Sequence, residues 1–428
     1  MLASPEVRGL SSGPLPISPL PRPVGAAHDP ALTGMRAVAA LLVIGTHAAF
    51  ATGKLTHGYL GAILARMDIG VALFFVLSGF LLFRPWVTAA AGANRAPALG
   101  RYARRRTRRI MPAYLIAVSM TFALYTVFTP GPNPGQTWHG LLRYLTLTQI
   151  YTDDYLTTYL HPGLSQMWSL AVEVSFYAAL PGLAYLVLRS RRGSWTPTRT
   201  LTALAAMAAV TPVWLVVAHT TDALPNSAGM WLPAHLACFA AGMALAVLQV
   251  AGARCHAGVT LPPAAALYLI VATPIGGVIV GKDPAWSPVA KTLLYAVIAM
   301  LAVAPLALGP HGRYTRILAS RPMVRLGEIS YEIFLLHVVV MAVAMALILR
   351  WPLFTGSLAG LYAVTVAITI PLAWVLHRVT RRRPAQARAR SAGSRAASAR
   401  PRCDTASFSS GVISAAVFDE PCATKTGS

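Results

Sequence analysis

An arginine and a histidine share one face of an apolar stretch near the start of the chain. Residues 32–50 read LTGMRAVAALLVIGTHAAF, and a helix needs about 20 apolar residues to cross a bilayer. Arg36 and His47 are 11 residues apart. At about 100° per residue, this spacing puts both side chains on one stripe, about 16 Å apart along the axis. Such groups are costly in hydrocarbon unless they face a protein interior or water, so the stretch predicts a polar site inside a membrane helix bundle.

The composition agrees with a membrane setting. Hydrophobic residues make up 56% of the 428 residues, charged residues make up 11%, and the mean hydropathy is +0.58. These values lie outside the range of ordinary soluble domains. The net charge of +23 lies in short segments between apolar runs and in the last part of the chain. This distribution is typical of a protein that orients itself in a membrane, and it argues against a nucleic-acid partner.

The apolar runs predict an all-α, polytopic membrane helix bundle of about ten transmembrane helices. The segments that this count places inside carry 16 arginines, whereas those placed outside carry five Lys and Arg. This bias predicts that both termini are cytoplasmic, in a multi-pass protein of the plasma membrane. The predicted spans are 32–52, 69–90, 110–129, 165–188, 200–219, 230–250, 262–281, 289–308, 326–349 and 353–377.

Three parts of the chain differ in their expected organisation. We expect residues 1–30, which are rich in proline, to form a disordered leader, and residues 31–378 to form the membrane domain. Residues 379–428, which begin with an Arg, Ala and Ser-rich run, predict a disordered cytoplasmic tail. Residues 138–151 predict an amphipathic helix on the outer side. No cysteine or histidine spacing suggests a metal site, and Cys238, Cys255, Cys403 and Cys422 predict no disulfide.

A cluster of arginines precedes the third predicted span. The segment RRRTRRIMPAYL covers residues 104–115; Arg105 and Arg109 are four residues apart, and Arg106 and Arg109 are three apart, so they share a helical face. One interpretation is that these charges only set the orientation in the membrane. The other is that they bind the phosphates of a cytoplasmic cofactor, because guanidinium groups bind phosphate oxygens in pairs.

Two later spans carry further titratable groups. Glu173 lies about eight residues into the fourth span, and Ser330 and His337 are seven residues apart on one stripe of the ninth. We expect His47, Glu173 and His337 to reach a similar depth. Such groups can simply pair helices, but their convergence favours a functional site.

These motifs resemble the acyltransferase-3 family of integral membrane O-acyltransferases. Five segments resemble motifs of the family: TGMRAVAALLVIGTH; DIGVALFFVLSGFLL (residues 68–82); the RxxR of Arg106 and Arg109 followed by IMPAY; WSLAVEVSFY; and LGEISYEIFLLH. They occur in the family's order over residues 30–378. Three positions depart from the family's pattern: Thr33 stands where an Asp is usual, Val174 where an acidic residue is common, and Phe334 where a Tyr is usual.

The resemblance implies transfer of an acyl group, often acetyl, from acyl-coenzyme A to a hydroxyl of a sugar or a macrolide-like polyketide. No tightly bound cofactor is implied. A hydroxyl needs a base to become a good nucleophile, and histidine suits neutral pH. We expect His47 to be this base, Glu173 to orient it, and Arg36 to bind the donor or stabilise negative charge. We assign Arg105, Arg106 and Arg109 to coenzyme A, and Ser78, Ser330, Tyr331 and His337 to the cavity lining.

Two other classes of protein share these features. A proton-coupled secondary transporter could use His47, Glu173 and His337 as a relay, and it would move substrate without coenzyme A. A membrane scaffold could use the same groups only to pair helices, and replacing His47 would then change only stability. The aromatic loop 130–165 predicts either an acceptor contact or an interfacial aromatic belt, and the Ala, Arg and Pro content suggests a bacterial source.

Overall fold

The computed structural model describes residues 29–92, 95–152, 160–189, 195–277, 284, 286–310 and 312–381. Within these residues the fold is all helical, without strands, as the apolar runs predict. Most of the predicted leader and nearly all of the predicted tail lie outside the described residues.

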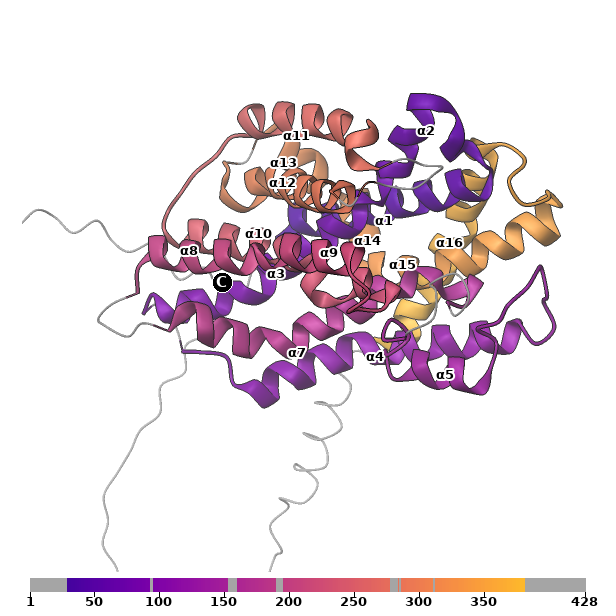
Figure 1. The fold of residues 1–428 in the computed structure, drawn as a ribbon, viewed down its shortest axis with the longest axis horizontal. Helices are drawn as coiled ribbons and strands as arrows, with labels where there is room; N and C mark the ends of the chain where they lie inside the picture. Colours follow the sequence, from indigo (N-terminus) through magenta and orange to yellow (C-terminus); the bar gives the residue numbers. More distant parts are fainter. Residues whose placement is uncertain are drawn as a thin grey trace, which may run out of the picture. The chain divides into compact units, whose positions relative to one another are not determined.

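Fifteen α-helices and several short helical segments make up the described fold (Figure 1). The α-helices are α1 (Pro30–Ala51), α2 (Gly58–Ala65), α3 (Ile69–Ala90), α4 (Leu99–Leu124), α5 (Trp138–Leu145), α7 (Trp168–Leu188), α8 (Pro197–Ala208), α9 (Val210–Thr220), α10 (Leu232–Val250), α11 (Ala257–Val271), α12 (Ser287–Leu308), α13 (Arg313–Leu318), α14 (Arg321–Glu328), α15 (Ser330–Val343) and α16 (Leu358–Thr380). The shorter segments are η1 (Lys54–Thr56), η2 (Arg66–Asp68), η3 (Pro162–Met167), η4 (Asn226–Met230), η5 (Pro274–Gly276) and the π-helical η6 (Ala344–Leu349).

Eight helical stretches among the described residues are long and apolar enough to cross a membrane. They correspond to eight of the ten predicted spans. The other two predicted spans correspond to α4, whose first half carries six arginines, and to α11, which has only 15 residues. The chain is therefore a multi-pass membrane protein, while the count of ten crossings and the side of each terminus stay predictions.

Two predicted spans are interrupted in the structure. The span predicted at 200–219 is divided into α8 and α9, which meet at Ala209. Pro212 follows the break and has no backbone N–H to donate to the carbonyl of Ala208, so the helical hydrogen-bond ladder is incomplete there. The span predicted at 326–349 starts as a separate short helix, α14, and α15 begins only at Ser330.

The start of α1 is fixed by a residue outside the apolar run. The side chain of Asp29 accepts hydrogen bonds from the backbone N–H groups of Ala31 (3.0 Å) and Leu32 (3.4 Å). This satisfies two of the N–H groups that a helix start leaves without partners. Asp29 thus caps the helix that carries Arg36 and His47.

Helices α3 and α10 pack against each other over a long contact in the core. Both use glycine at the contact. A Cβ atom on Gly79 would overlap the carbonyl oxygen of Phe239, and one on Gly242 would overlap that of Val76. Small residues that let helix backbones approach are a common basis of helix association in membranes. This contact holds α3, which carries Ser78, in a fixed register.

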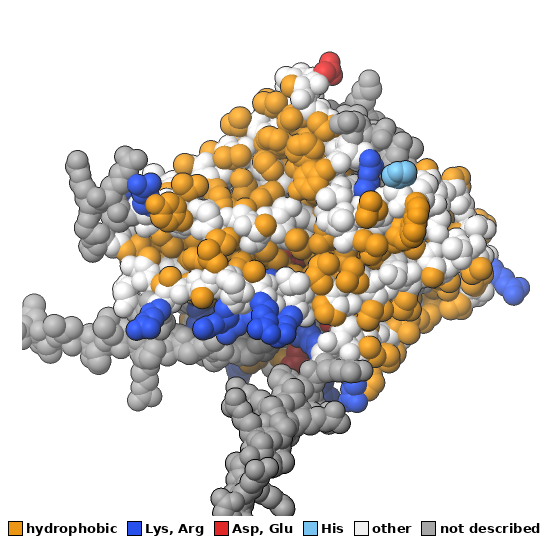
Figure 2. All heavy atoms as spheres, turned by 90° about the horizontal axis from the view of Figure 1, so that it is seen from below, with side chains coloured by type: hydrophobic (Ala, Val, Ile, Leu, Met, Phe, Trp, Pro, Cys, Tyr) orange, Lys and Arg blue, Asp and Glu red, His pale blue; other side chains and the backbone are white. Residues whose placement is uncertain are grey.

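Positive charge gathers at one end of the helices. The arginines of α4 precede Ile110, whose carbonyl accepts a hydrogen bond of 3.0 Å from the hydroxyl of Tyr331 at the start of α15. A Cβ atom on Gly327 of α14 would overlap the carbonyl oxygen of Thr33, so α1 also begins there. Figure 2 shows Lys and Arg side chains gathered along one border of a hydrophobic surface. We call this the arginine end of the bundle, and the opposite one the far end.

Candidate active site

Two histidine rings from different helices meet inside the bundle. His47 of α1 and His337 of α15 have ring centroids 5.1 Å apart, tilted by 55°. His337 is fully buried, and its Nδ1 donates a hydrogen bond of 2.9 Å to the carbonyl of Phe334. A neutral imidazole that donates from Nδ1 carries its lone pair on Nε2. This Nε2 has no hydrogen-bond partner among the described residues, so the pair presents an unsatisfied acceptor inside the protein.

The carboxylate of Glu173 lies in a separate polar cluster. Its Oε1 accepts hydrogen bonds from the hydroxyl of Ser78 on α3 and from that of Tyr177, one turn further along α7. Tyr331 of α15 also interacts electrostatically with this carboxylate. Side chains from α3, α7 and α15 therefore converge on Glu173.

Arginine side chains of α4 complete this cluster. Arg106 interacts electrostatically with Tyr177, Arg109, Tyr102 and Glu173. Its Nε is buried and has no hydrogen-bond partner among the described residues. The hydroxyl of Tyr102 donates to the carbonyl of Tyr177 at 3.0 Å, which ties α4 to α7 at this level. We call Ser78, Glu173, Tyr177, Arg106 and Arg109 the carboxylate cluster.

The histidine pair and the carboxylate cluster are separate sites, and no hydrogen bond joins them among the described residues. Thr46 of α1 donates a hydrogen bond of 3.2 Å to the carbonyl of Ala65, and a Cβ on Gly70 would overlap the carbonyl of Ala39. Thus α1 runs antiparallel to the segment that leads into α3. From the Ala39–Gly70 contact, His47 lies eight residues along α1 toward the far end and Ser78 eight residues along α3 toward the arginine end. His47 and Ser78 therefore lie on opposite sides of this contact along the bundle.

Glu173 was expected to orient His47. No hydrogen bond joins Glu173 to His47 or His337 among the described residues, so this role stays a prediction. The close contacts of Glu173 among the described residues are with the carboxylate cluster and Tyr331.

The remaining predicted site residues occupy varied environments. Arg36 is half-buried on α1, and Arg105 is exposed on α4 beside half-buried Arg106 and Arg109. The hydroxyl of Ser330 is fully buried and donates to the carbonyl of Gly327 at 2.8 Å, at the junction of α14 and α15.

The structure adds groups that the sequence argument did not assign. Tyr177 is the clearest, and its position four residues after Glu173 on one helical face was a usable signal. Asp68 had no such signal. The charge of Asp68 interacts with His47, and its carboxylate accepts a hydrogen bond from Tyr295 and forms an ion pair with Lys291 at 2.7 Å. Tyr295 and Lys291 both belong to α12, more than 200 residues further along the chain.

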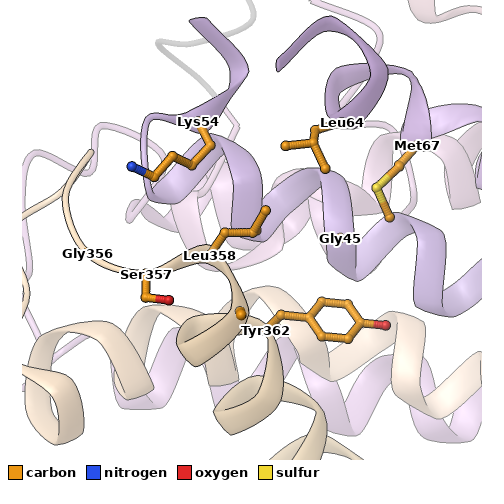
Figure 3. Close-up of a pocket in the computed structure, with 9 residues that line it drawn as sticks. Gly45, Lys54, Leu64, Met67, Gly356, Ser357, Leu358 and Tyr362 are labelled. Atoms are coloured by element: carbon orange, nitrogen blue, oxygen red, sulfur yellow. The ribbon is translucent and has the colours of Figure 1, made fainter. Parts of the chain in front are cut away.

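A pocket of about 610 Å³ opens near the far end of α1 (Figure 3). One wall comes from α1 and the connection to α3, and the other from the start of α16. Its walls are mainly apolar, with Lys54, Ser357 and Tyr362 as the polar exceptions. The lining residues are Gly45, Lys54, Leu64, Met67, Gly356, Ser357, Leu358, Ala359 and Tyr362.

A family model described as an acyltransferase domain matches residues 29–378. This match covers most of the chain and every residue of the two polar sites. The chain therefore belongs to the acyltransferase-3 family, and it is an O-acyltransferase.

Several known proteins are similar to this chain. The acyltransferase MdmB of Streptomyces mycarofaciens is 29% identical over 373 residues, which cover 82% of this chain and 90% of MdmB. The peptidoglycan O-acetyltransferase OatA of Listeria monocytogenes is 24% identical over 204 residues, 46% of this chain and 30% of OatA. The O-acetyltransferase OatA of Staphylococcus aureus is 23% identical over 331 residues, 72% of this chain and 50% of OatA. No solved structure matches the chain significantly.

Proposed function

We propose that this protein transfers an acyl group, in the first instance acetyl, from acyl-coenzyme A to a hydroxyl of a carbohydrate or a macrolide-like natural product. The observation that carries this proposal is the histidine pair, in which a buried imidazole nitrogen without a partner lies beside His47. A buried acceptor of this kind is costly unless a ligand donates to it. An acceptor hydroxyl is such a donor.

The chemistry at the pair is general base catalysis. An imidazole of His47 takes the proton of the acceptor hydroxyl as its oxygen attacks the thioester carbonyl. The C–O bond forms, the C–S bond breaks, and coenzyme A leaves as a thiol after it receives the proton. His337 holds the hydroxyl or His47 in position through its free Nε2, since its Nδ1–H is committed to Phe334.

The arginine end binds the acyl donor. Arg106 and Arg109 offer guanidinium groups to the phosphates of coenzyme A. The separation of this cluster from the histidine pair suits a donor whose charged nucleotide binds at one place while a long flexible arm carries the thioester to another. Arg36, on the face of α1 that also holds His47, lies on the path between them. Its role is to bind the donor or stabilise the charge that develops on the carbonyl oxygen.

The membrane orientation follows from the same assignment. Acyl-coenzyme A is a cytoplasmic metabolite, so the arginine end faces the cytoplasm, as the distribution of arginines predicts for a plasma-membrane protein. The peptidoglycan O-acetyltransferase among the similar proteins supports a sugar acceptor, and a macrolide-like acceptor remains the second choice within the same activity.

The test measures loss of label from radiolabelled acetyl-coenzyme A by membranes that contain the full-length protein. Wild type is compared with His47→Ala and with His219→Ala, a control that removes an exposed histidine of α9. We expect turnover in wild type and in the control, and a loss of about 100-fold or more in His47→Ala. Insertion at equal level is checked for each variant.

A transporter gives a different result. If wild type does not turn over the thioester, while a proton-coupled flux into vesicles depends on His47, the acyl-coenzyme A proposal is wrong. If His47→Ala turns over acetyl-coenzyme A as fast as wild type, the role of His47 is wrong even though the activity stands.

A further inference from the structure

The pocket at the far end of α1 lies apart from the histidine pair. Gly45 lines it, and His47 is two residues further along α1, so its side chain points about 200° away from the Gly45 face. That other direction leads to His337 of α15. The pocket therefore has no part in the proton transfer proposed above.

The walls of the pocket come from two segments that are tied together. The backbone N–H of Phe354 donates to the carbonyl of Ala51, the last residue of α1, at 2.8 Å. Phe354 and Phe50 pack edge to face with ring centroids 5.6 Å apart. The loop before α16 is thus fastened to the end of α1 that carries His47.

Large apolar side chains are exposed around this part of the structure. Phe50, Leu60, Leu353 and Phe354 are each more than half exposed. On a membrane protein, a surface of this kind faces lipid, and an apolar pocket that opens onto lipid is filled by hydrocarbon chains, because water there is unfavourable. Leu64, Met67 and Leu358 supply the apolar wall for such a chain.

Lys54 gives the pocket a charge preference. Its side chain is half-buried, and no hydrogen bond or ion pair to its ammonium is found among the described residues. No Asp or Glu lines the pocket. Lys54 follows directly after the end of α1, which is where a membrane helix meets the lipid headgroups.

From these observations we propose that the pocket binds one anionic phospholipid. Its phosphate pairs with Lys54, an acyl chain lies against Leu64, Met67 and Leu358, and Ser357 offers a hydroxyl group to the headgroup or glycerol oxygens. The lipid bridges the end of α1 and the start of α16, and so steadies the helix that carries His47. This inference rests on the membrane setting and does not depend on the proposed reaction.

The experiment uses the full-length protein in phosphatidylcholine nanodiscs that contain a trace of phosphatidylglycerol with a photoreactive acyl chain. After irradiation, labelled peptides are identified by mass spectrometry. We expect label in both pocket walls, residues 54–67 and 356–362, and competition by unlabelled phosphatidylglycerol but not by more phosphatidylcholine.

Three variants test the site. Lys54→Ala should lower the labelling about fivefold, the effect of one basic residue near an anionic lipid, and Ala359→Phe should abolish it by filling the pocket. The matched control is Arg350→Asn, which removes a neighbouring cation outside the pocket lining; asparagine tolerates the left-handed conformation there, at φ 53°. If Ala359→Phe fails to fold, the comparison of Lys54→Ala with Arg350→Asn carries the test.

Three outcomes overturn the inference. Equal labelling of wild type and Lys54→Ala removes the charge preference, and equal competition by phosphatidylcholine removes the anionic lipid. Displacement of the label by the enzyme's own acylated product, but not by phosphatidylglycerol, makes the pocket an acceptor site instead. Turnover of acetyl-coenzyme A in the same nanodiscs reports separately on the proposed reaction.

Discussion

The two polar sites of this bundle differ in the kind of buried group that has no hydrogen-bond partner among the described residues. In the carboxylate cluster, Glu173 accepts hydrogen bonds from two hydroxyl groups, and the unpartnered group is a donor, Nε of Arg106; in the histidine pair it is an acceptor, Nε2 of His337. A carboxylate held by two hydrogen bonds is fixed in place, and so is the negative charge that it presents to neighbouring groups. An imidazole with a free lone pair can take up a proton or accept a hydrogen bond from a hydroxyl group. This difference supports our proposal that the first site binds the donor and the second transfers the proton.

Removing the histidine pair should have the largest effect. His47→Ala, and separately His337→Ala, should lower kcat for acyl transfer about 100-fold or more, the usual contribution of a positioned base. KM for acyl-coenzyme A should change little, because in our proposal the charged end of the donor binds at the carboxylate cluster and not at the histidine pair. Steady-state kinetics in detergent or nanodiscs give both constants. A large rise of KM in His47→Ala would mean that donor binding and proton transfer are not divided between the two sites.

Removing the arginines of the carboxylate cluster should have the opposite kinetic signature. Arg106→Ala combined with Arg109→Ala should raise KM for acyl-coenzyme A about tenfold or more through the lost phosphate contacts, with a smaller change in kcat. The matched control is Arg104→Ala combined with Arg108→Ala, which removes the same charge from exposed positions of the same helix. If the control raises KM equally, general charge and not the cluster attracts the donor.

Loosening Glu173 should have a smaller effect. Ser78→Ala and Tyr177→Phe each remove one hydrogen bond to the same oxygen, Oε1, and each should weaken donor binding by about 0.5–1 kcal/mol, or about two- to fivefold. Because they share an acceptor, the double variant should differ from the sum of the single ones, as a double-mutant cycle would show. Ser175→Ala, on the same helix but bonded to Ala171 and Tyr151, is the control. Strict additivity would mean that the two hydroxyl groups do not act through one carboxylate.

Local patterns predicted much of the fold. The apolar run of α3 coincides with its predicted bounds, 69–90, because a continuous run of apolar residues at that length has no other stable arrangement in a bilayer. The break between α8 and α9 depends on one proline inside an apolar run, which hydropathy does not register. The separation of α14 from α15 lies beside the close approach of Gly327 to Thr33, a contact between distant segments that hydropathy does not register.

The site was predictable in its parts but not in its assembly. His47, His337, Glu173 and Ser78 were singled out because polar groups in apolar helices are unusual. Their grouping depends on helix register, which contacts such as Thr46 to Ala65 and Gly70 to Ala39 decide. Residue counting along single helices does not give contacts between helices, so the hydrogen bond from Ser78 to Glu173 was not predicted.

A third histidine, outside the predicted spans, separates the pH dependence of stability from that of catalysis. His161 is fully buried just before η3; its Nδ1 accepts the backbone N–H of Gly163 at 3.1 Å, and its Nε2 lies 2.8 Å from Oε1 of Gln136. These bonds fit a neutral ring, and burial lowers the pKa of His161 from 6.5 to about 4. The unfolded chain therefore binds more protons than the folded one between these values, so its contribution to stability is present above pH 6.5 and is lost as the pH falls toward 4.

The expected effect of His161 is modest and can be measured by thermal unfolding. Between pH 7.5 and 5.5, wild type should lose about 1 kcal/mol more stability than His161→Gln, whose amide can replace the bonds without titrating. Activity over the same range should follow the histidine pair in both proteins, because His161 touches neither site. If His161→Gln changed the pH profile of kcat in the same way as it changed stability, the loop before η3 would have to be coupled to the histidine pair, and the division of the bundle into a binding site and a proton-transfer site would be incomplete.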